Sequence, residues 1–500
     1  MKSPSFLFGL MAAIALLAVF PQGRVAGQSS VSVQELVFDK PLTRELAGGQ
    51  TDEFALALAA NQYVEVTLAR NGIVLVVTLL APDGHLVAEG TGDTEAVGDD
   101  TVRYQAQEAG TYKLMVRPSR PEANRAQYQV RLAVLRPGTD ADRERVAAHQ
   151  LLGAGSRLMT QHTAAAAQQA ASKFREASQR FRAVEDKPGE AIALGFLAGA
   201  LFEQNLAKEA LPLMEQSLAM FRALGDRVRE AEMLNAVGWA HRSLGQPQQS
   251  QTYHQQALTL SRALGNRSHE LSALNNLGLV TSVLGDEQAS CAYYEEALKL
   301  LPQSPDRSIE GFLSNNLASS YRRLGEPYKA REYFQRALAF FRATGQRAQE
   351  AIAMANLGAV HFGLDEYQPA LESVQAALAI HRQSGNRRYE AVTLRNMALV
   401  YLRLGDKDQA DSLLAETLAI CRALTDRSCE AATLTNIGRS QQGRGQFAQG
   451  LTTFQQALAL HRAVSNRPDE VERLIEIGQI YGALGETTKA LAHFQEALPL

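Results

Sequence analysis

A unit of about forty residues repeats from roughly Arg182 to the last residue of the chain. The segment FRALGDRVREAEMLNAVGWAHRSLGQ, which starts at Phe221, returns forty positions later as SRALGNRSHELSALNNLGLVTSVLGD. Further copies start at Phe341, His381, Cys421 and His461. A fixed period of this length without strand-like alternation is typical of helical solenoids, whose repeats pack against their neighbours. The repeat therefore predicts an array of helical hairpins, a class of fold that binds partners along its surface.

Residues of matched size recur at fixed places in the unit. One column, read every forty residues, holds only alanine and glycine: Ala198, Gly238, Gly278, Ala318, Gly358, Ala398, Gly438 and Gly478. Another column holds large residues: Tyr294, Phe334, Leu414, Phe454 and Phe494. We expect the small residues to let the two helices of a hairpin approach closely while the large ones fill the remaining space.

The ends of the first helix in each unit are also marked. Glycine stands where the chain must turn, at Gly245, Gly285, Gly325, Gly405, Gly445 and Gly485. Short polar residues that can cap free amides precede the helix, at Asp186, Asp226, Asn266, Asp306, Asn386, Asp426 and Asn466. These signals predict a left-handed glycine after the first helix and a side-chain cap before it.

The pattern LNNLG…LG…A…YY…AL resembles the tetratricopeptide repeat, in the forty-residue form of MalT-like regulators and kinesin light chains. The resemblance covers roughly residues 140–500 and implies a mostly helical protein with a right-handed superhelix of hairpins. We expect a degenerate first repeat, which caps the array, over residues 140–184. About eight repeats follow over residues 185–500.

Residues 31–136 have a β pattern. The run from Ile73 to Leu80 (IVLVVTLL) is predicted to be a buried strand, and Pro82-Asp83-Gly84 predicts the turn after it. Tyr112, Leu114 and Val116 alternate with Thr111, Lys113 and Met115, as in a half-buried strand. The fold prediction for this region is a small all-β sandwich.

The first 27 residues are predicted to be a signal peptide. Lys2 supplies the positive start, residues 6–20 (FLFGLMAAIALLAVF) are too short an apolar run for a comfortable membrane span, and residues 25–27 (VAG) suit cleavage before Gln28. The alternative is an uncleaved N-terminal anchor. We expect an exported protein, periplasmic or extracellular, with no stable membrane span once the signal is removed.

Five asparagines form another column of the repeat: Asn276, Asn316, Asn356, Asn396 and Asn436. A carboxamide both donates and accepts, so such a column can pair with an extended peptide backbone. In similar repeat proteins this position lines the concave groove and holds peptide. The alternative is that each asparagine only bridges neighbouring helices inside the solenoid.

Other polar patterns have structural interpretations. Seven arginines from Arg227 to Arg467 each precede a glutamate by three residues, which predicts an ion-pair ladder rather than a ligand-binding stripe. Equivalent positions His381, Cys421 and His461 lie too far apart in packed helices to share a metal, and we expect no metal or cofactor. Cys421 and Cys429 flank one linker and could approach each other in an oxidising compartment. Their repeat-equivalent positions show no constraint that requires a disulfide, so unpaired thiols are the favoured interpretation and a disulfide is the alternative.

No catalytic motif such as GxxxxGK[ST], HExxH or GxSxG occurs, so we predict a non-enzymatic scaffold that binds a peptide or protein partner. The net charge of −3 argues against nucleic acid as the partner. A second hypothesis follows from the order of signal, sandwich and repeats, which resembles secreted bacterial CHAT-domain proteins. In that family the β region is similar to pre-peptidase C-terminal domains, and a caspase-like cysteine peptidase follows the repeats. The array would then be a truncated targeting or regulatory part, with catalysis beyond residue 500. A third class, MalT-like transcription regulators, shares the repeat type but conflicts with the predicted signal.

Overall fold

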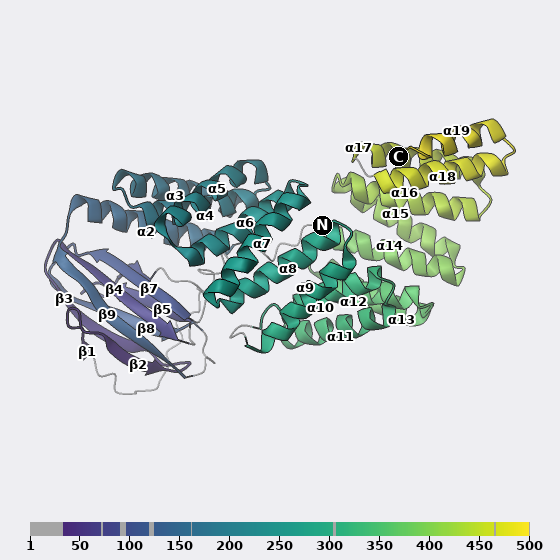
Figure 1. Ribbon diagram of the computed structural model, residues 1–500. Helices are drawn as coiled ribbons and strands as arrows, with labels where there is room; N and C mark the ends of the chain where they lie inside the picture. Colours follow the sequence, from purple (N-terminus) through teal and green to yellow (C-terminus); the bar gives the residue numbers. More distant parts are fainter. Residues whose placement is uncertain are drawn as a thin grey trace. The chain divides into compact units, whose positions relative to one another are not determined.

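The computed structural model describes residues 34–71, 74–90, 97–119, 125–161, 163–303, 307–464 and 467–499. The predicted signal peptide and the capping residues Asp306 and Asn466 lie outside these ranges. An all-β region comes first in the described chain and a long series of helices follows it (Figure 1). The chain divides into two compact units, the first up to Leu284 with residues 300–306, the second with residues 285–299 and from Arg307 onward. The predicted fold class, mostly helical with a small β region in front, is confirmed.

The β region is a sandwich of two sheets. One sheet has the order β1-β3-β8-β5-β6 and the other β2-β9-β4-β7, and every strand pairing except β1 with β3 is antiparallel. The strands are β1 (Gln34–Glu35), β2 (Leu42–Leu46), β3 (Asp52–Leu58), β4 (Gln62–Asn71), β5 (Leu75–Leu80), β6 (Leu86–Glu89), β7 (Val97–Gln105), β8 (Gly110–Pro118) and β9 (Ala126–Pro137).

Alternation along the strands builds the sandwich core. Tyr112, Leu114 and Val116 of β8 are buried, and the intervening residues are exposed or half-buried, as the period of two requires. The predicted turn after β5 is present, since the Gly84 amide donates to the carbonyl of Ala81 at 2.9 Å and Gly84 has φ of 90°. A positive φ of this kind explains glycine at this position.

The first unit continues with helices α2 (Asp140–Met159), α3 (Ala164–Ala183), α4 (Lys187–Glu203), α5 (Ala207–Leu224), α6 (Arg227–Ser243), α7 (Pro247–Leu264) and α8 (Arg267–Val283). The second unit holds nearly all of α9 (Glu287–Leu300), followed by α10 (Glu310–Arg323), α11 (Pro327–Ala343), α12 (Arg347–Gly363), α13 (Tyr367–Gln383), α14 (Arg387–Leu404), α15 (Lys407–Ala423), α16 (Arg427–Gly443), α17 (Phe447–Ala463), α18 (Arg467–Ala483) and α19 (Thr487–Ala497). A short 3-10 helix, Leu301–Gln303, follows α9. None of the helices described is both long enough and apolar enough to cross a membrane.

The predicted helix-end signals are confirmed where the structure describes them. All six glycines expected after the first helix have positive φ, between 75° and 87°. The Asp226 carboxylate accepts from the amide of Arg229 at 3.1 Å, and Asp186, Asn266, Asn386 and Asp426 cap their helices in the same way. These short polar residues satisfy amides that the helix itself leaves unpaired.

Close packing explains the column of small residues. A Cβ atom at Gly438 in α16 would lie 2.8 Å from the ring of Phe454 in α17. The Phe454 side chain is fully buried. The same relation joins Gly478 in α18 to Phe494 in α19, at 2.6 Å. Each small residue therefore leaves room for the large residue sixteen positions later.

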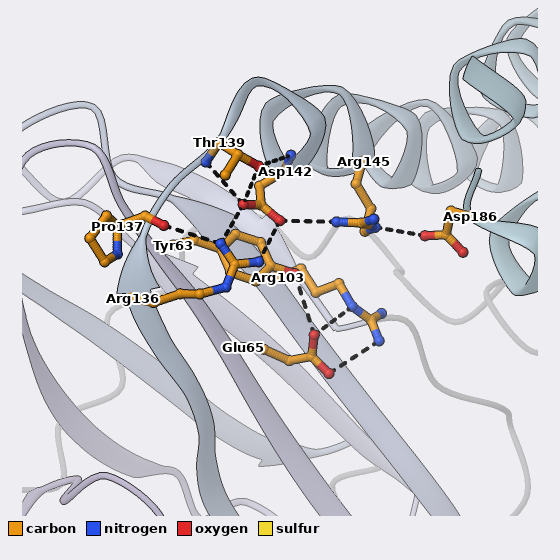
Figure 2. Close-up of polar contacts among 9 residues, drawn as sticks. All are labelled: Tyr63, Glu65, Arg103, Arg136, Pro137, Thr139, Asp142, Arg145 and Asp186. Atoms are coloured by element: carbon orange, nitrogen blue, oxygen red, sulfur yellow. Dashed lines mark hydrogen bonds and ion pairs between the residues drawn. The ribbon is translucent and has the colours of Figure 1, made fainter. Parts of the chain in front are cut away.

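A polar cluster joins the sandwich to the first helices within the first unit (Figure 2). Thr139 caps α2, and its backbone amide and hydroxyl both donate to the carboxylate of Asp142. Arg136, at the end of β9, and Arg145 also donate to Asp142. Arg145 reaches further to Asp186, the cap of α4, at 2.8 Å. The buried carboxylate of Asp142 thus connects the end of β9 to the start of α2, and Arg145 extends the cluster to the cap of α4.

Candidate peptide-binding surface

The five predicted asparagines lie at the same turn of the first helix in successive hairpins: Asn276 in α8, Asn316 in α10, Asn356 in α12, Asn396 in α14 and Asn436 in α16. Asn276 belongs to the first unit and the other four to the second. The two end members are buried, with exposed fractions of 3% and 7%, and the three middle members are half-buried. The column is therefore placed in the protein surface rather than projecting from it.

The amides of the column differ in their hydrogen bonds. Asn356 donates from Nδ2 to Oδ1 of Asn315 at 3.2 Å, which bridges α12 and α10. This contact is what the internal-bridge interpretation requires at one position. The amides of Asn396 and Asn436, by contrast, have no hydrogen-bond partner among the described residues. Peptide contact by the column stays a prediction, with unused amides at two of its members.

In the second unit, two further columns of residues lie on the same helix face as the asparagines, one on each side of them. The sequence analysis did not predict these columns. Four residues earlier lie Phe312, Ile352, Val392 and Ala432, and three residues later lie Ser319, Ala359, Leu399 and Arg439. All of them are half-buried except Arg439, which is exposed. Residues three and four apart share a helix face, so the forty-residue register contained the signal for these columns. The face around the asparagines is mainly apolar.

Five of the seven predicted ion pairs are present: Arg227, Arg267, Arg307, Arg347 and Arg387 each pair with the glutamate three residues later. Among the described residues, the predicted partners Arg427 and Arg467 do not pair with Glu430 and Glu470.

A second set of ion pairs was not predicted. Glu390 is bridged by Arg387, three residues earlier, at 2.7 Å, and by Arg382, eight residues earlier, at 3.1 Å. Only 2% of the Glu390 side chain is exposed. The same double clamp holds Glu230, Glu270 and Glu350. Glu430 and Glu470 are bridged by Arg422 and Arg462, also eight residues earlier. The arginine eight residues earlier, which the sequence analysis did not predict as a partner, lies at the end of the second helix of one hairpin. Its side chain contacts the glutamate in the first helix of the next hairpin.

Cys421 and Cys429 form a disulfide, so the prediction that they stay unpaired was wrong. Their Cα atoms are 5.5 Å apart, inside the range that a disulfide spans. The turn capped by Asp426 brings the end of α15 beside the start of α16. Repeat-equivalent positions carry no cysteine, so comparing repeats could not reveal that this turn places the two positions together. Cys291 is buried and free.

The histidines of the repeats pack against neighbouring side chains. His381 and His461 are buried, and burial lowers the pKa of both imidazoles. His381 stacks on Tyr389 with ring centroids 5.3 Å apart. No group of three or more metal-ligating side chains is gathered anywhere in the described ranges.

The sequence profile of the tetratricopeptide repeat matches six overlapping or adjoining stretches: residues 189–263, 228–303, 269–343, 308–383, 349–423 and 429–500. Together these stretches cover more than half of the chain. No curated protein is similar enough in sequence to count as a relative.

Two solved structures have a similar fold at low sequence identity. The apo form of the quorum sensor NprR from B. thuringiensis is 13% identical, with a TM-score of 0.53, and the match covers 70% of this chain and 98% of NprR. A Rap protein complexed with Competence and Sporulation Factor is also 13% identical, with a TM-score of 0.50 and coverage of 72% and 97%. At this identity the likeness concerns the fold alone.

Proposed function

The chain belongs to the tetratricopeptide repeat family, and from this premise we propose that it is a scaffold that binds an extended peptide segment of a partner protein along the second-unit members of the asparagine column, Asn316, Asn356, Asn396 and Asn436. The observation that carries the proposal is that the side-chain amides of Asn396 and Asn436, at equivalent positions of successive first helices, have no hydrogen-bond partner within the part of the chain that the structure describes. A mid-helix asparagine is unfavourable for helix formation, so an unpaired one needs another reason to be there.

The surroundings of the column fit such a ligand. An extended backbone has a donor and an acceptor at every residue, and a carboxamide can satisfy one of each. The half-buried apolar side chains of Phe312, Ile352 and Val392 would contact apolar side chains of the segment. The Rap protein of similar fold, solved in complex with Competence and Sporulation Factor, is a precedent for ligand binding by this architecture.

We also propose that the protein is exported. The predicted signal peptide motivates the proposal, and the disulfide between Cys421 and Cys429 supports it, because structural disulfides persist in oxidising compartments. Mass spectrometry of the protein from its native source tests this directly. Cleavage before Gln28 together with alkylation-resistant Cys421 and Cys429 is the expected result. A retained Met1 with two free thiols would reject export.

Peptide binding is tested by selecting displayed random peptides on the immobilised full chain and measuring the best one by fluorescence anisotropy. Asn396→Ala and Asn436→Ala should each weaken binding about five- to tenfold, because each removes about 1 kcal/mol of hydrogen bonding. Gln455→Ala, an exposed amide on α17, is the matched control and should leave the affinity unchanged. If the double asparagine variant binds the peptide as tightly as the parent chain, the column is not the binding site.

A further inference from the structure

A cavity of about 670 Å³, open to the surface, is lined by α5, α6 and α7 in the first unit, and none of the five asparagines contributes to its lining. Its lining includes Arg222 of α5, Arg227 and Glu230 of α6, and Thr252, Gln255, Gln256 and Thr259 of α7. The volume falls within the range of small-molecule sites. Neither the proposed peptide binding nor the repeat packing uses this space.

The cavity carries an excess positive charge. Glu230 is held between Arg222, whose Nε donates to Oε1 at 3.0 Å, and Arg227, whose Nη1 donates to Oε2 at 2.6 Å. Arg222 Nη2 also donates to Oε1 of Gln256 at 3.2 Å. These are the three charged residues of the lining, so two guanidiniums share one carboxylate. A neutral amide occupies the place where a second anion would balance the charge.

A later repeat of the chain shows which side chain can bind the guanidinium at the position of Gln256. In the repeat four units later, Arg382 and Arg387 hold Glu390 in the same way. The position equivalent to Gln256 there is Glu416, whose Oε1 lies 2.6 Å from Nη2 of Arg382. A carboxylate therefore binds this guanidinium edge with good geometry, and the resulting group of two arginines and two glutamates is neutral. In the first unit, Gln256 stands at this position, so the guanidinium of Arg222 has no carboxylate on its Nη2.

Helix α7 contributes neutral polar side chains to the lining near the guanidinium of Arg222. The side chains of Gln255 and Gln256 are exposed, and amides such as these both donate and accept. The hydroxyls of Thr252 and Thr259 donate to backbone carbonyls within the helix, at 3.1 and 2.9 Å. Their oxygens remain as acceptors on the cavity side. Such a wall suits a ligand that carries hydroxyl or N–H groups next to its charge.

We propose that this cavity is a binding site for the carboxylate of a small polar molecule, either an acidic sugar or the carboxyl end of a short peptide. The carboxylate would displace the Gln256 amide from Nη2 of Arg222 and take the place that Glu416 has on Arg382 in the later repeat. Hydroxyl or N–H groups of the ligand would contact the glutamine and threonine side chains of α7. This site is independent of the asparagine column and of the function proposed for it.

The test is isothermal titration of the full chain with two probes, trigalacturonate and the acetylated tripeptide N-acetyl-Ser-Gln-Glu. Each is paired with a neutral counterpart, the fully methyl-esterified trigalacturonate and N-acetyl-Ser-Gln-Gln-amide. Binding of at least one acid, at least tenfold tighter than its neutral counterpart, is expected, and the better acid identifies the source of the carboxylate. Failure of both acids to bind, or equal binding of acid and neutral forms, would overturn the proposal.

Two variants locate the binding. Gln256→Glu recreates the internal partner seen at Glu416 and should reduce acid binding at least tenfold, as should Arg222→Gln. Gln409→Glu makes the same charge change at an exposed position of α15, outside the cavity lining, and should leave binding unchanged. Equal losses in Gln256→Glu and Gln409→Glu would show a general charge effect and reject the site.

Discussion

The guanidinium of Arg136 donates one hydrogen bond to each carboxylate oxygen of Asp142, Nη1 to Oδ2 at 2.6 Å and Nη2 to Oδ1 at 2.8 Å (Figure 2). The two residues lie on either side of the connection between the last strand, β9, and the first described helix, α2. Only 1% of the Asp142 side chain is exposed, whereas 45% of that of Arg136 is. This paired contact holds the start of α2 against the end of β9.

Replacing Asp142 by asparagine should destabilise the first unit by about 2 kcal/mol at pH 7, since it leaves Arg136 and Arg145 without their shared anion. The hydrogen bonds from Arg136, followed by those from Thr139, hold the pKa of the Asp142 carboxyl well below its usual range. A depressed pKa contributes stability that is present above the unfolded value, about 3.9, and is lost as the pH falls below it.

The difference between the parent chain and Asp142→Asn should therefore be constant above about pH 5 and shrink steadily below pH 4. Urea denaturation of the full chain across this range measures it. Asp140→Asn, which changes a fully exposed acid in the same helical turn, is the control and should cost under about 0.5 kcal/mol. A pH-independent difference for Asp142→Asn would contradict the assigned ion pair.

The ion-pair ladder predicts a contrast between two glutamates that share Arg382. Glu390 is buried and held by two arginines, whereas 42% of the Glu416 side chain is exposed. Glu390→Gln should destabilise the second unit by about 2 kcal/mol, because two guanidiniums lose a buried partner. Glu416→Gln should cost under about 0.5 kcal/mol, as for other surface pairs. Thermal unfolding of both variants checks the order, and equal shifts would refute it.

Local signals in the sequence were sufficient for the hairpins. Gly405 marks a left-handed turn and Asn386 a helix start by their own conformational and hydrogen-bonding preferences, which need no knowledge of distant residues. The alternation in β8 likewise depends on one strand and one buried face. Such features depend on residues that are close together in the sequence, so they can be predicted from it.

Contacts between side chains of different helices could not be predicted from local sequence signals. Arg382 lies eight residues before Glu390, a separation that has no meaning within one helix and becomes a contact only when the chain turns back. The cavity beside Gln256 depends on which side chains neighbouring helices bring to one place. For the asparagine column, the sequence predicted the shared face. It did not predict that the Asn356 amide bonds to Asn315 while the Asn396 amide has no partner in the described ranges.

Reduction of the disulfide should destabilise the second unit by about 2 kcal/mol. The bond between Cys421 and Cys429 closes a short loop, and cross-links restrict the unfolded chain by an amount that grows slowly with loop length. Thermal unfolding with and without a reducing agent measures the effect. Cys429→Ser should lower the stability of the oxidised protein and abolish its response to the reducing agent. A full response in that variant would show that the disulfide is not responsible.

The small-residue column predicts a steric effect at Gly438. Gly438→Val should destabilise the hairpin of α16 and α17 by about 2 kcal/mol or more, because the new side chain meets the buried ring of Phe454, 2.8 Å from the Cβ position. Gly443→Val, at the end of the same helix with nothing within 4 Å of its Cβ position, should change stability by under about 0.5 kcal/mol. Chemical denaturation compares the two, and similar losses would argue against close packing at Gly438.

His254 occupies the buried position that Phe334 and Phe454 fill in other repeats, and its Nδ1 lies 3.0 Å from Oδ1 of Asn235. Burial lowers the pKa of His254 to about 3. The unfolded chain takes up a proton near pH 6.5 and the folded chain does not, so stability falls as the pH drops from 6.5 toward 3, by about 1.4 kcal/mol per pH unit.

His254→Phe should remove this fall, so that the variant gains about 2 kcal/mol relative to the parent chain between pH 7 and pH 5. The prediction concerns the slope, because loss of the Asn235 contact shifts stability equally at every pH. Phe334→His, the reciprocal change at the equivalent buried position, should introduce a similar slope. Urea denaturation at each pH measures both, and parallel curves for the parent chain and His254→Phe would show that His254 is not buried in its neutral form.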